Sequence, residues 1–179
     1  MAKTDLQKRT VQEKLNSMDV DTILVTSGLT TNSATANTFM WNAPIKIENA
    51  VPIEGGTALL HSVVGLTFSN PDESLSDAAL IQNPYSLVFT SSSDSSTMTL
   101  GTSLLTSALS SDMLSNTCGV IHMNNMIDVG RVALSHKANC GIVLKAEPGS
   151  RDVYMWGIAL SSDNYNNSLS KFRIGLIKD

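Results

Sequence analysis

The spacing of apolar residues changes once along the chain, close to residue 20. Before that point the spacing is helical, because Val11, Leu15 and Met18 fall on one face at i, i+4 and i+7. The apolar stripe is narrow, so this helix should be weak alone and should need a surface to lie against. The sequence therefore predicts a short N-terminal helical arm, residues 1–20, with its helix over 4–18.

Residues 21–179 show strand-like patterns instead. Short runs rich in β-branched and aromatic residues alternate with Gly, Pro, Asn and Ser turns, and residues 104–113 fit either a short helix or a packed loop. The predicted strands are 23–26, 39–47, 58–68, 85–90, 117–123, 126–134, 141–146, 153–160 and 169–177. Regularly spaced short strands are typical of sandwiches and barrels. The sequence thus predicts an all-β domain over 21–179, an antiparallel β-sandwich that is jelly-roll-like.

Apolar and other residues alternate most clearly in the last predicted strand, 169–177. Phe172, Ile174 and Leu176 point one way, whereas Lys171, Arg173 and Gly175 point the other. This strand is therefore expected to bury one face and to leave the other in solvent.

A glycine pair, Gly55-Gly56, stands between an acidic residue and a long apolar run, and it has two interpretations. A phosphate-binding loop needs further glycines at fixed spacing, a following lysine or a helix that starts at the loop. The chain has no lysine there, and the run 58–68 is rich in β-branched residues. The pair is better read as a turn with positive φ between two antiparallel strands.

Charge is distributed unevenly. Between Lys46 and Arg131 the chain has no Lys or Arg, and the same interval contains eight Asp and Glu residues. Phosphate recognition depends on Lys and Arg, so this part of the chain is a poor nucleic-acid surface. The first seventeen residues are basic instead, with Lys and Arg at 3, 8, 9 and 14. Such an arm more often contacts acidic protein, or keeps a terminus soluble, than binds DNA.

No segment is apolar enough to cross a membrane, and the charged N-terminus does not fit a secretory signal peptide. The sequence therefore predicts neither a nucleic-acid partner nor a membrane partner.

Candidate chemistry is sparse. His61, His122 and His136 lack zinc-ligand spacing and are expected to be ordinary strand or turn histidines. Cys118 and Cys140 are not a CxxC pair; two buried free thiols are the favoured interpretation, and a disulfide is the alternative.

An acidic cluster, Asp72, Glu73 and Asp77, lacks EF-hand spacing and fits a solvated loop better than a calcium site. No nucleophile elbow is present. We therefore expect no catalytic residue, no metal and no cofactor.

The order of motifs resembles a family of small structural proteins from tailed-bacteriophage virions. The segments that carry the resemblance are "IENAVPIEGG", "ALLHSVVGLTF", "PYSLVFTSSSD", "DMLSNTCGVIHM", "NCGIVLKAEPGSRDVYMWGIAL" and "SLSKFRIGLIKD". The matching positions are Asn49, Ala50, Gly55, Gly56, Ser62, Val63, Phe89, Asp112, Gly141, Ala146, Tyr154 and the strand 169–177. The chain departs from the pattern at Gly65-Leu66-Thr67, where an aspartate is usual, and in its long serine-rich loop 91–101. Residues 1–40 are not covered.

The resemblance implies a non-enzymatic capsid decoration (cement) protein that binds the major capsid protein on the outer surface of the virion, after assembly in the host cytoplasm. It also implies a homo-oligomer, with a trimer favoured. The arm residues expected to contact the capsid are Lys3, Lys8, Arg9, Val11, Lys14, Leu15 and Met18. The alternatives are a tail, neck or fibre component, or a carbohydrate-binding module for host attachment.

Overall fold

The computed structural model describes residues 20–27, 36–41, 43–68, 84–93, 115–124, 126–128, 132–161 and 169–178. The predicted helix 4–18, the segment 104–113 and the acidic cluster at 72–77 lie outside these residues. Within the described ranges the named elements are all strands. The prediction of an all-β chain is therefore confirmed for the part that the structure describes.

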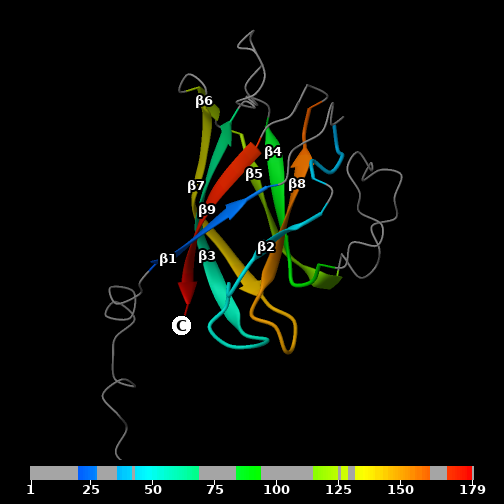
Figure 1. Ribbon diagram of the computed structural model, residues 1–179, viewed down its shortest axis with the longest axis vertical. Helices are drawn as coiled ribbons and strands as arrows, with labels where there is room; N and C mark the ends of the chain where they lie inside the picture. Colours follow the sequence, from blue (N-terminus) through cyan, green and yellow to red (C-terminus); the bar gives the residue numbers. More distant parts are fainter. Residues whose placement is uncertain are drawn as a thin grey trace, which may run out of the picture.

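Nine strands are described, and every strand pair is antiparallel. The strands are β1 (Val20–Thr26), β2 (Ile45–Ile47), β3 (Thr57–Phe68), β4 (Tyr85–Thr90), β5 (Thr117–Met123), β6 (Met126–Asp128), β7 (Val132–Lys145), β8 (Val153–Ala159) and β9 (Leu169–Lys178). They form a five-stranded sheet with the order β1-β9-β3-β7-β6 and a four-stranded sheet with the order β2-β8-β4-β5 (Figure 1).

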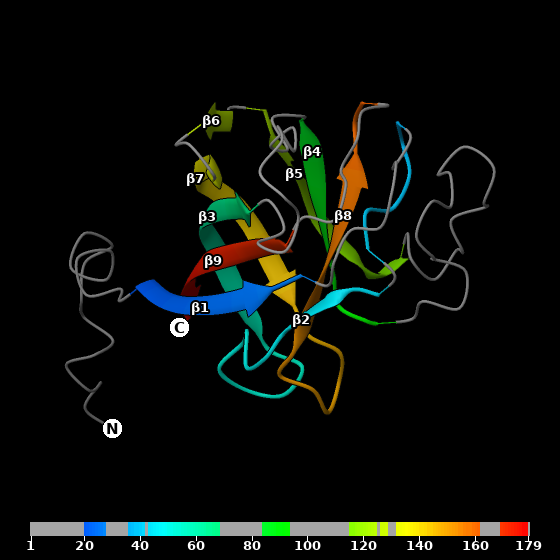
Figure 2. The ribbon, with the colours of Figure 1, turned by 45° about the horizontal axis from the view of Figure 1, so that its top comes forward.

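The main hydrophobic core draws residues from both sheets. The five-stranded sheet contributes Leu60, Ile174 and Leu176, and the four-stranded sheet contributes Leu87 and Met155, all inaccessible to solvent. Figure 2 shows β1, β9 and β3 on one side of the molecule and β4 and β8 on the other. Burial of this aliphatic and aromatic surface is the main force that holds the two sheets in place.

The four-stranded sheet is also buried on its second face. Phe39, Val88, Trp156 and Ile158 form a separate apolar cluster there. Phe39 forms an antiparallel bridge with Ile158, and the Met40 amide donates a 2.9 Å hydrogen bond to the Gly157 carbonyl, so this segment lies beside β8 and brings the Phe39 ring against Trp156. All six positions of β4 are buried, including the polar residues Ser86 and Thr90.

Several strand predictions were accurate, and others were wrong. Strands β4 and β5 have the predicted bounds, whereas the predicted strand 39–47 is reduced to the three residues of β2. The predicted strands 126–134 and 141–146 are instead the short β6 and one long β7. The turn predicted at 137–139 lies within β7, where Asn139 and Gly141 have φ of 52° and 67° and the register opposite β3 shifts. A bulge, rather than a turn, absorbs these residues.

The Gly55-Gly56 turn is confirmed in part. Gly55 has φ of 66°, the left-handed conformation that glycine adopts without a steric cost. The flanking strands, however, belong to different sheets, since β2 pairs with β8 whereas β3 pairs with β7 and β9. The expectation of a turn between two paired antiparallel strands was therefore wrong: this turn connects the two sheets.

Candidate functional site

The seven arm residues expected to contact a capsid lie outside the described residues, so the structure brings none of them together. Of the other residues singled out in the sequence, His122 in β5 lies beside Ser86, with Nδ1 and Oγ 2.8 Å apart. Within the described ranges, no group of three or more His, Cys, Asp or Glu residues could hold a metal ion. The part of the chain that the structure describes also contains no helix long and apolar enough to cross a membrane.

Cys118 and Cys140 are free thiols, so the disulfide alternative was wrong. Both side chains are only partly buried, although the sequence suggested full burial. Burial raises the pKa of each thiol, and nearby Lys145 and Lys137 oppose this shift at Cys118 and Cys140 respectively. A raised pKa disfavours the thiolate, which is the reactive form, so neither cysteine resembles an activated nucleophile.

The described surface feature most suited to recognition is the side of the five-stranded sheet that faces away from the core, here called the outer face. Val20 of β1, Ile177 of β9, Leu59 of β3 and Val143 of β7 are successive cross-strand partners on it. They form an aliphatic row about 14 Å across four strands. Val20, Leu59 and Val143 are 44%, 36% and 58% exposed. Single exposed apolar residues are common, but a contiguous row of them is typical of an interaction surface.

The charged residues of the outer face are basic. Arg173 and Lys171 alternate with the buried residues of β9, and exposed Lys145 lies two positions beyond Val143 in β7. Among the described outward-facing positions of β1, β3, β7 and β9, none is Asp or Glu. The face is therefore positive although the whole chain carries a formal net charge of −4. Such a surface should favour a partner that is both apolar and acidic.

A second exposed feature lies where two loops meet at one end of the molecule, here called the tip: residues 51–56 and 147–150. The Gly55 amide donates a 2.8 Å hydrogen bond to the Ser150 carbonyl, which joins the two loops. The tip presents Ile53, which is 68% exposed, together with the exposed side chains of Glu54 and Glu147. It thus offers one exposed apolar side chain and two carboxylates.

The position of Ile53 is fixed by its own loop. The Gly56 amide donates to the Ile53 carbonyl at 3.0 Å, and a Cβ at residue 56 would lie 2.8 Å from both that oxygen and Ile53 Cγ1. Glycine at 56 is therefore needed for close packing, even though its φ is not positive. The opposite loop has its own closing bond, from the Ser150 amide to the Glu147 carbonyl at 3.0 Å.

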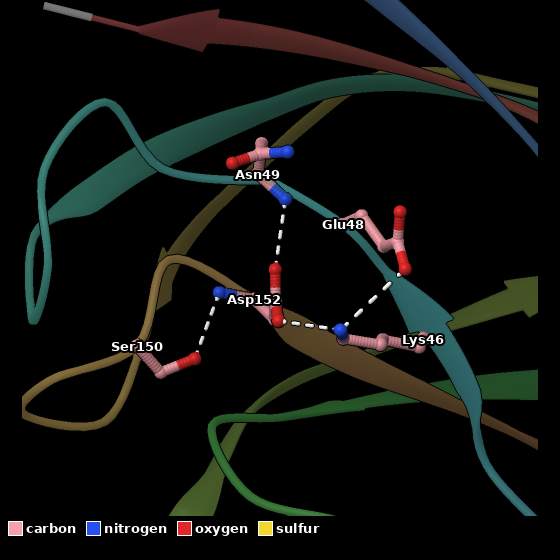
Figure 3. Close-up of polar contacts among 5 residues, drawn as sticks. All are labelled: Lys46, Glu48, Asn49, Ser150 and Asp152. Carbon is pink, nitrogen blue, oxygen red and sulfur yellow. Dashed lines mark hydrogen bonds and ion pairs between the residues drawn. The ribbon is translucent and has the colours of Figure 1, made fainter.

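A polar cluster secures the base of the tip (Figure 3). Asp152 accepts hydrogen bonds from the Asn49 amide and from Lys46 Nζ, both at 2.9 Å, and its own amide donates to Ser150 Oγ at 3.0 Å. The hydrogen bond from Lys46 holds the pKa of the Asp152 carboxyl below its usual value of 3.8, against an opposing effect of burial. Asn49 has φ of 52°, which its bond to Asp152 helps to maintain. We read this cluster as structural support for the tip.

Sequence reasoning missed both surfaces. The outward alternation of the last strand was visible, but the aliphatic row is made of residues from four strands whose register no local pattern reveals. Ile53 lies inside the quoted motif "IENAVPIEGG", where the glycine pair drew attention and the isoleucine did not.

No family model matches the sequence, and no curated protein matches it significantly.

Proposed function

We propose that this protein is a non-enzymatic virion structural protein that binds the major capsid protein and decorates and stabilises the head of a tailed bacteriophage. In this proposal the body is a jelly-roll-like β-sandwich, and residues 1–20 form a helical arm. The protein acts as a homo-oligomer, with a trimer favoured, on the outer surface of the capsid. The motif order described above is what suggests the virion.

The observation that carries the proposal is the exposed aliphatic row Val20, Ile177, Leu59 and Val143 on a β-sheet framework. Aliphatic surface on a rigid sheet suits recognition of another protein, because little conformational entropy is lost when it is covered. A decoration protein needs such a surface, and it also has to stay soluble before assembly. The basic residues Lys145, two positions from Val143, and Arg173, four positions from Ile177, flank the row on opposite sides and favour solubility.

The arm adds a second, weaker element to the proposal. Its apolar residues, Val11, Leu15 and Met18, suit a helix that becomes ordered only against a partner, and its lysines suit an acidic partner. The entropic cost of ordering the arm would be recovered in the assembled shell, where many weak contacts act together.

The arm is tested by deletion of residues 1–19, which leaves β1 intact because that strand begins at Val20. Full-length and truncated protein are mixed with capsid shells that lack decoration, and binding is measured by co-sedimentation. We expect the truncated protein to keep the circular dichroism of the body and to bind at least tenfold more weakly. Undiminished binding by the truncated protein would show that the arm has no role in attachment.

Two matched variants separate the charges of the arm from its apolar residues. One replaces Lys3, Lys8, Arg9 and Lys14 with Ser, and the other replaces Val11, Leu15 and Met18 with Ser. If the arm docks as an amphipathic helix, the apolar variant should lose as much binding as the deletion. The charge variant should bind more weakly than the unaltered protein mainly at low salt, because high salt already screens the attraction of the basic residues. Failure of full-length protein to bind shells under any condition would refute the capsid role itself.

The alternatives predict different results. Sugar-binding sites usually present exposed aromatic rings, whereas Trp41, Trp156 and Tyr85 are at most 2% exposed. Glycan-array binding by the purified protein would nevertheless revive that alternative. Electron microscopy of particles carrying the labelled protein would distinguish a position on the head from one on the tail, neck or fibre.

A further inference from the structure

We propose that the tip of one copy of this protein docks on the outer face of a second copy, with Ile53 against the aliphatic row and the tip glutamates beside Lys145 and Arg173. The contact is head-to-tail, since it joins two different surfaces. Both proposals use the aliphatic row, so a copy whose row is covered by a neighbouring tip would have to contact the capsid through its arm. Self-association is measured without capsid shells, so its failure can be distinguished from failure of the capsid role.

The tip and the outer face each present an aliphatic surface. Ile53 is the most exposed large apolar side chain among the described residues. The row offers Leu59 and Val143 at adjacent positions on β3 and β7, a flat aliphatic surface on which a branched side chain can pack. Covering exposed aliphatic surface on both copies is favourable, by roughly 25 cal/mol for each Å² removed from water.

The charges favour this arrangement over a symmetric one. Residues 51–56 and 147–150 contain two carboxylates and no cation, and adjacent Arg151 donates from Nε to the Val51 carbonyl at 3.3 Å. The outer face contains cations and, among its described outward positions, no carboxylate. Packing two outer faces together would place two basic surfaces against each other, which is repulsive. Placing the tip on the face pairs opposite charges instead.

The tip is well organised for docking. Hydrogen bonds at 2.8–3.1 Å join its loops, including one from the Ala146 amide to the Gly56 carbonyl. The Asp152 cluster supports it from one side (Figure 3), and the Asn49 carbonyl accepts a 2.7 Å hydrogen bond from Lys178 of β9. Since the loops are already held in place, little backbone entropy remains to be lost when Ile53 is covered.

A head-to-tail contact between two copies leaves one tip and one face of the pair free for further copies. Such contacts produce closed rings when the rotation between neighbours closes, and open chains when it does not. The self-association proposed here is therefore consistent with a cyclic trimer, and in that case each copy would supply one tip and one face.

The test uses the full chain in sedimentation velocity over a concentration range from micromolar to near-millimolar at low salt. We expect the mass to rise with concentration above the 19.1 kDa of one chain. Ile53→Ser should weaken association at least tenfold. The matched control is Ile127→Ser, because Ile127 is similarly exposed, at 61%, but lies on β6 away from the row. The control should associate as the unaltered protein does.

Charge reversal provides the second test. Reversing the tip (Glu54→Arg with Glu147→Arg) or the face (Lys145→Glu with Arg173→Glu) should each abolish association, since like charges then meet. The variant with all four changes has the net charge of the original protein and should associate again. All four side chains are exposed, so the folded body should be retained, and circular dichroism checks this.

Three results would overturn the proposal. One is a monomer at every concentration. Another is association that survives both Ile53→Ser and reversal of the tip charges, which would place the contact elsewhere, for example on the arm. The third is an equal loss in the Ile127→Ser control, which would indicate nonspecific hydrophobic association.

Discussion

A buried contact between the two sheets supports a quantitative prediction. Gly65 of β3 faces the core, and a Cβ added there would lie 2.5 Å from Tyr85 Oη and 2.6 Å from Ser135 Oγ. These two hydroxyl groups are hydrogen-bonded to each other at 2.8 Å. Tyr85 belongs to the four-stranded sheet, and Ser135 is the cross-strand partner of Gly65 in the five-stranded sheet. The substitution Gly65→Ala therefore disturbs a polar contact that crosses the core.

The expected cost follows from two effects. Both oxygens have to retreat by several tenths of an ångström, and such overpacking typically costs about 1–3 kcal/mol. The displaced hydroxyl groups then lose their bond in a buried position, where an unsatisfied group costs about 1–3 kcal/mol. Replacing glycine also lowers the conformational entropy of the unfolded chain, and this stabilises the folded protein by about 0.4–1 kcal/mol, which offsets part of the cost. We expect a net loss of about 2–4 kcal/mol in the free energy of unfolding, or a fall in Tm of roughly 5–15 °C.

The measurement is urea unfolding followed by circular dichroism, performed as a double-mutant cycle with Ser135→Ala. Removing Ser135 Oγ makes room for the new methyl group, so Gly65→Ala should cost at least about 1 kcal/mol less in that background. Gly149→Ala is the control. Its φ is 80° and no atom lies within 4 Å of the added Cβ, so only backbone strain of about 1 kcal/mol is expected, independent of Ser135.

Additivity of Gly65→Ala and Ser135→Ala to within about 0.5 kcal/mol would refute the reasoning, because it would mean that the two groups do not share one space. A single-substitution cost below about 0.5 kcal/mol would refute it as well, since the core would then have room to spare.

Two further predictions concern titratable groups. The pKa of Asp152 is lowered in the folded protein, so its contribution to stability is present above its unfolded value near 3.8 and is lost as the pH falls through the lower folded value. Asp152→Asn should therefore lower Tm at neutral pH and should make Tm fall less steeply as the pH drops below about 4. Thermal unfolding at several pH values measures both effects, and an unchanged fall of Tm below pH about 4 would contradict the prediction. The pKa values of Cys118 and Cys140 are raised by burial, so iodoacetamide should alkylate both thiols of the folded protein more slowly at pH 7 than it alkylates a free cysteine peptide. Mass spectrometry measures this rate, which should still be rising with pH where the rate of the free peptide has levelled off, and peptide-like rates at pH 7 would show that the thiols are not shielded.

The bounds of some strands could be predicted from the sequence and those of others could not, for a physical reason. Strands β4 and β5 were located to the residue, because continuous or alternating apolar runs bounded by turn residues are a local signal. The long β7 was not, because Asn139 and Gly141 have the composition of a turn, and only pairing with β3 on both sides of the bulge keeps them within one strand. The local sequence predicted a turn between two strands at 137–139, but the backbone hydrogen bonds with β3 continue on both sides of these residues and keep them in a single strand.

By itself the sequence determined the all-β class, the inward and outward positions of β9 and the left-handed glycine at 55, because each depends on a few neighbouring residues. Only the tertiary structure decided that β2 and β3 belong to different sheets, that Tyr85 reaches Ser135 above Gly65, and that Val20, Ile177, Leu59 and Val143 stand in one row. The members of these sets lie far apart in the chain. Strand order and register bring them together, and these are set by the total burial of both sheets rather than by any local pattern.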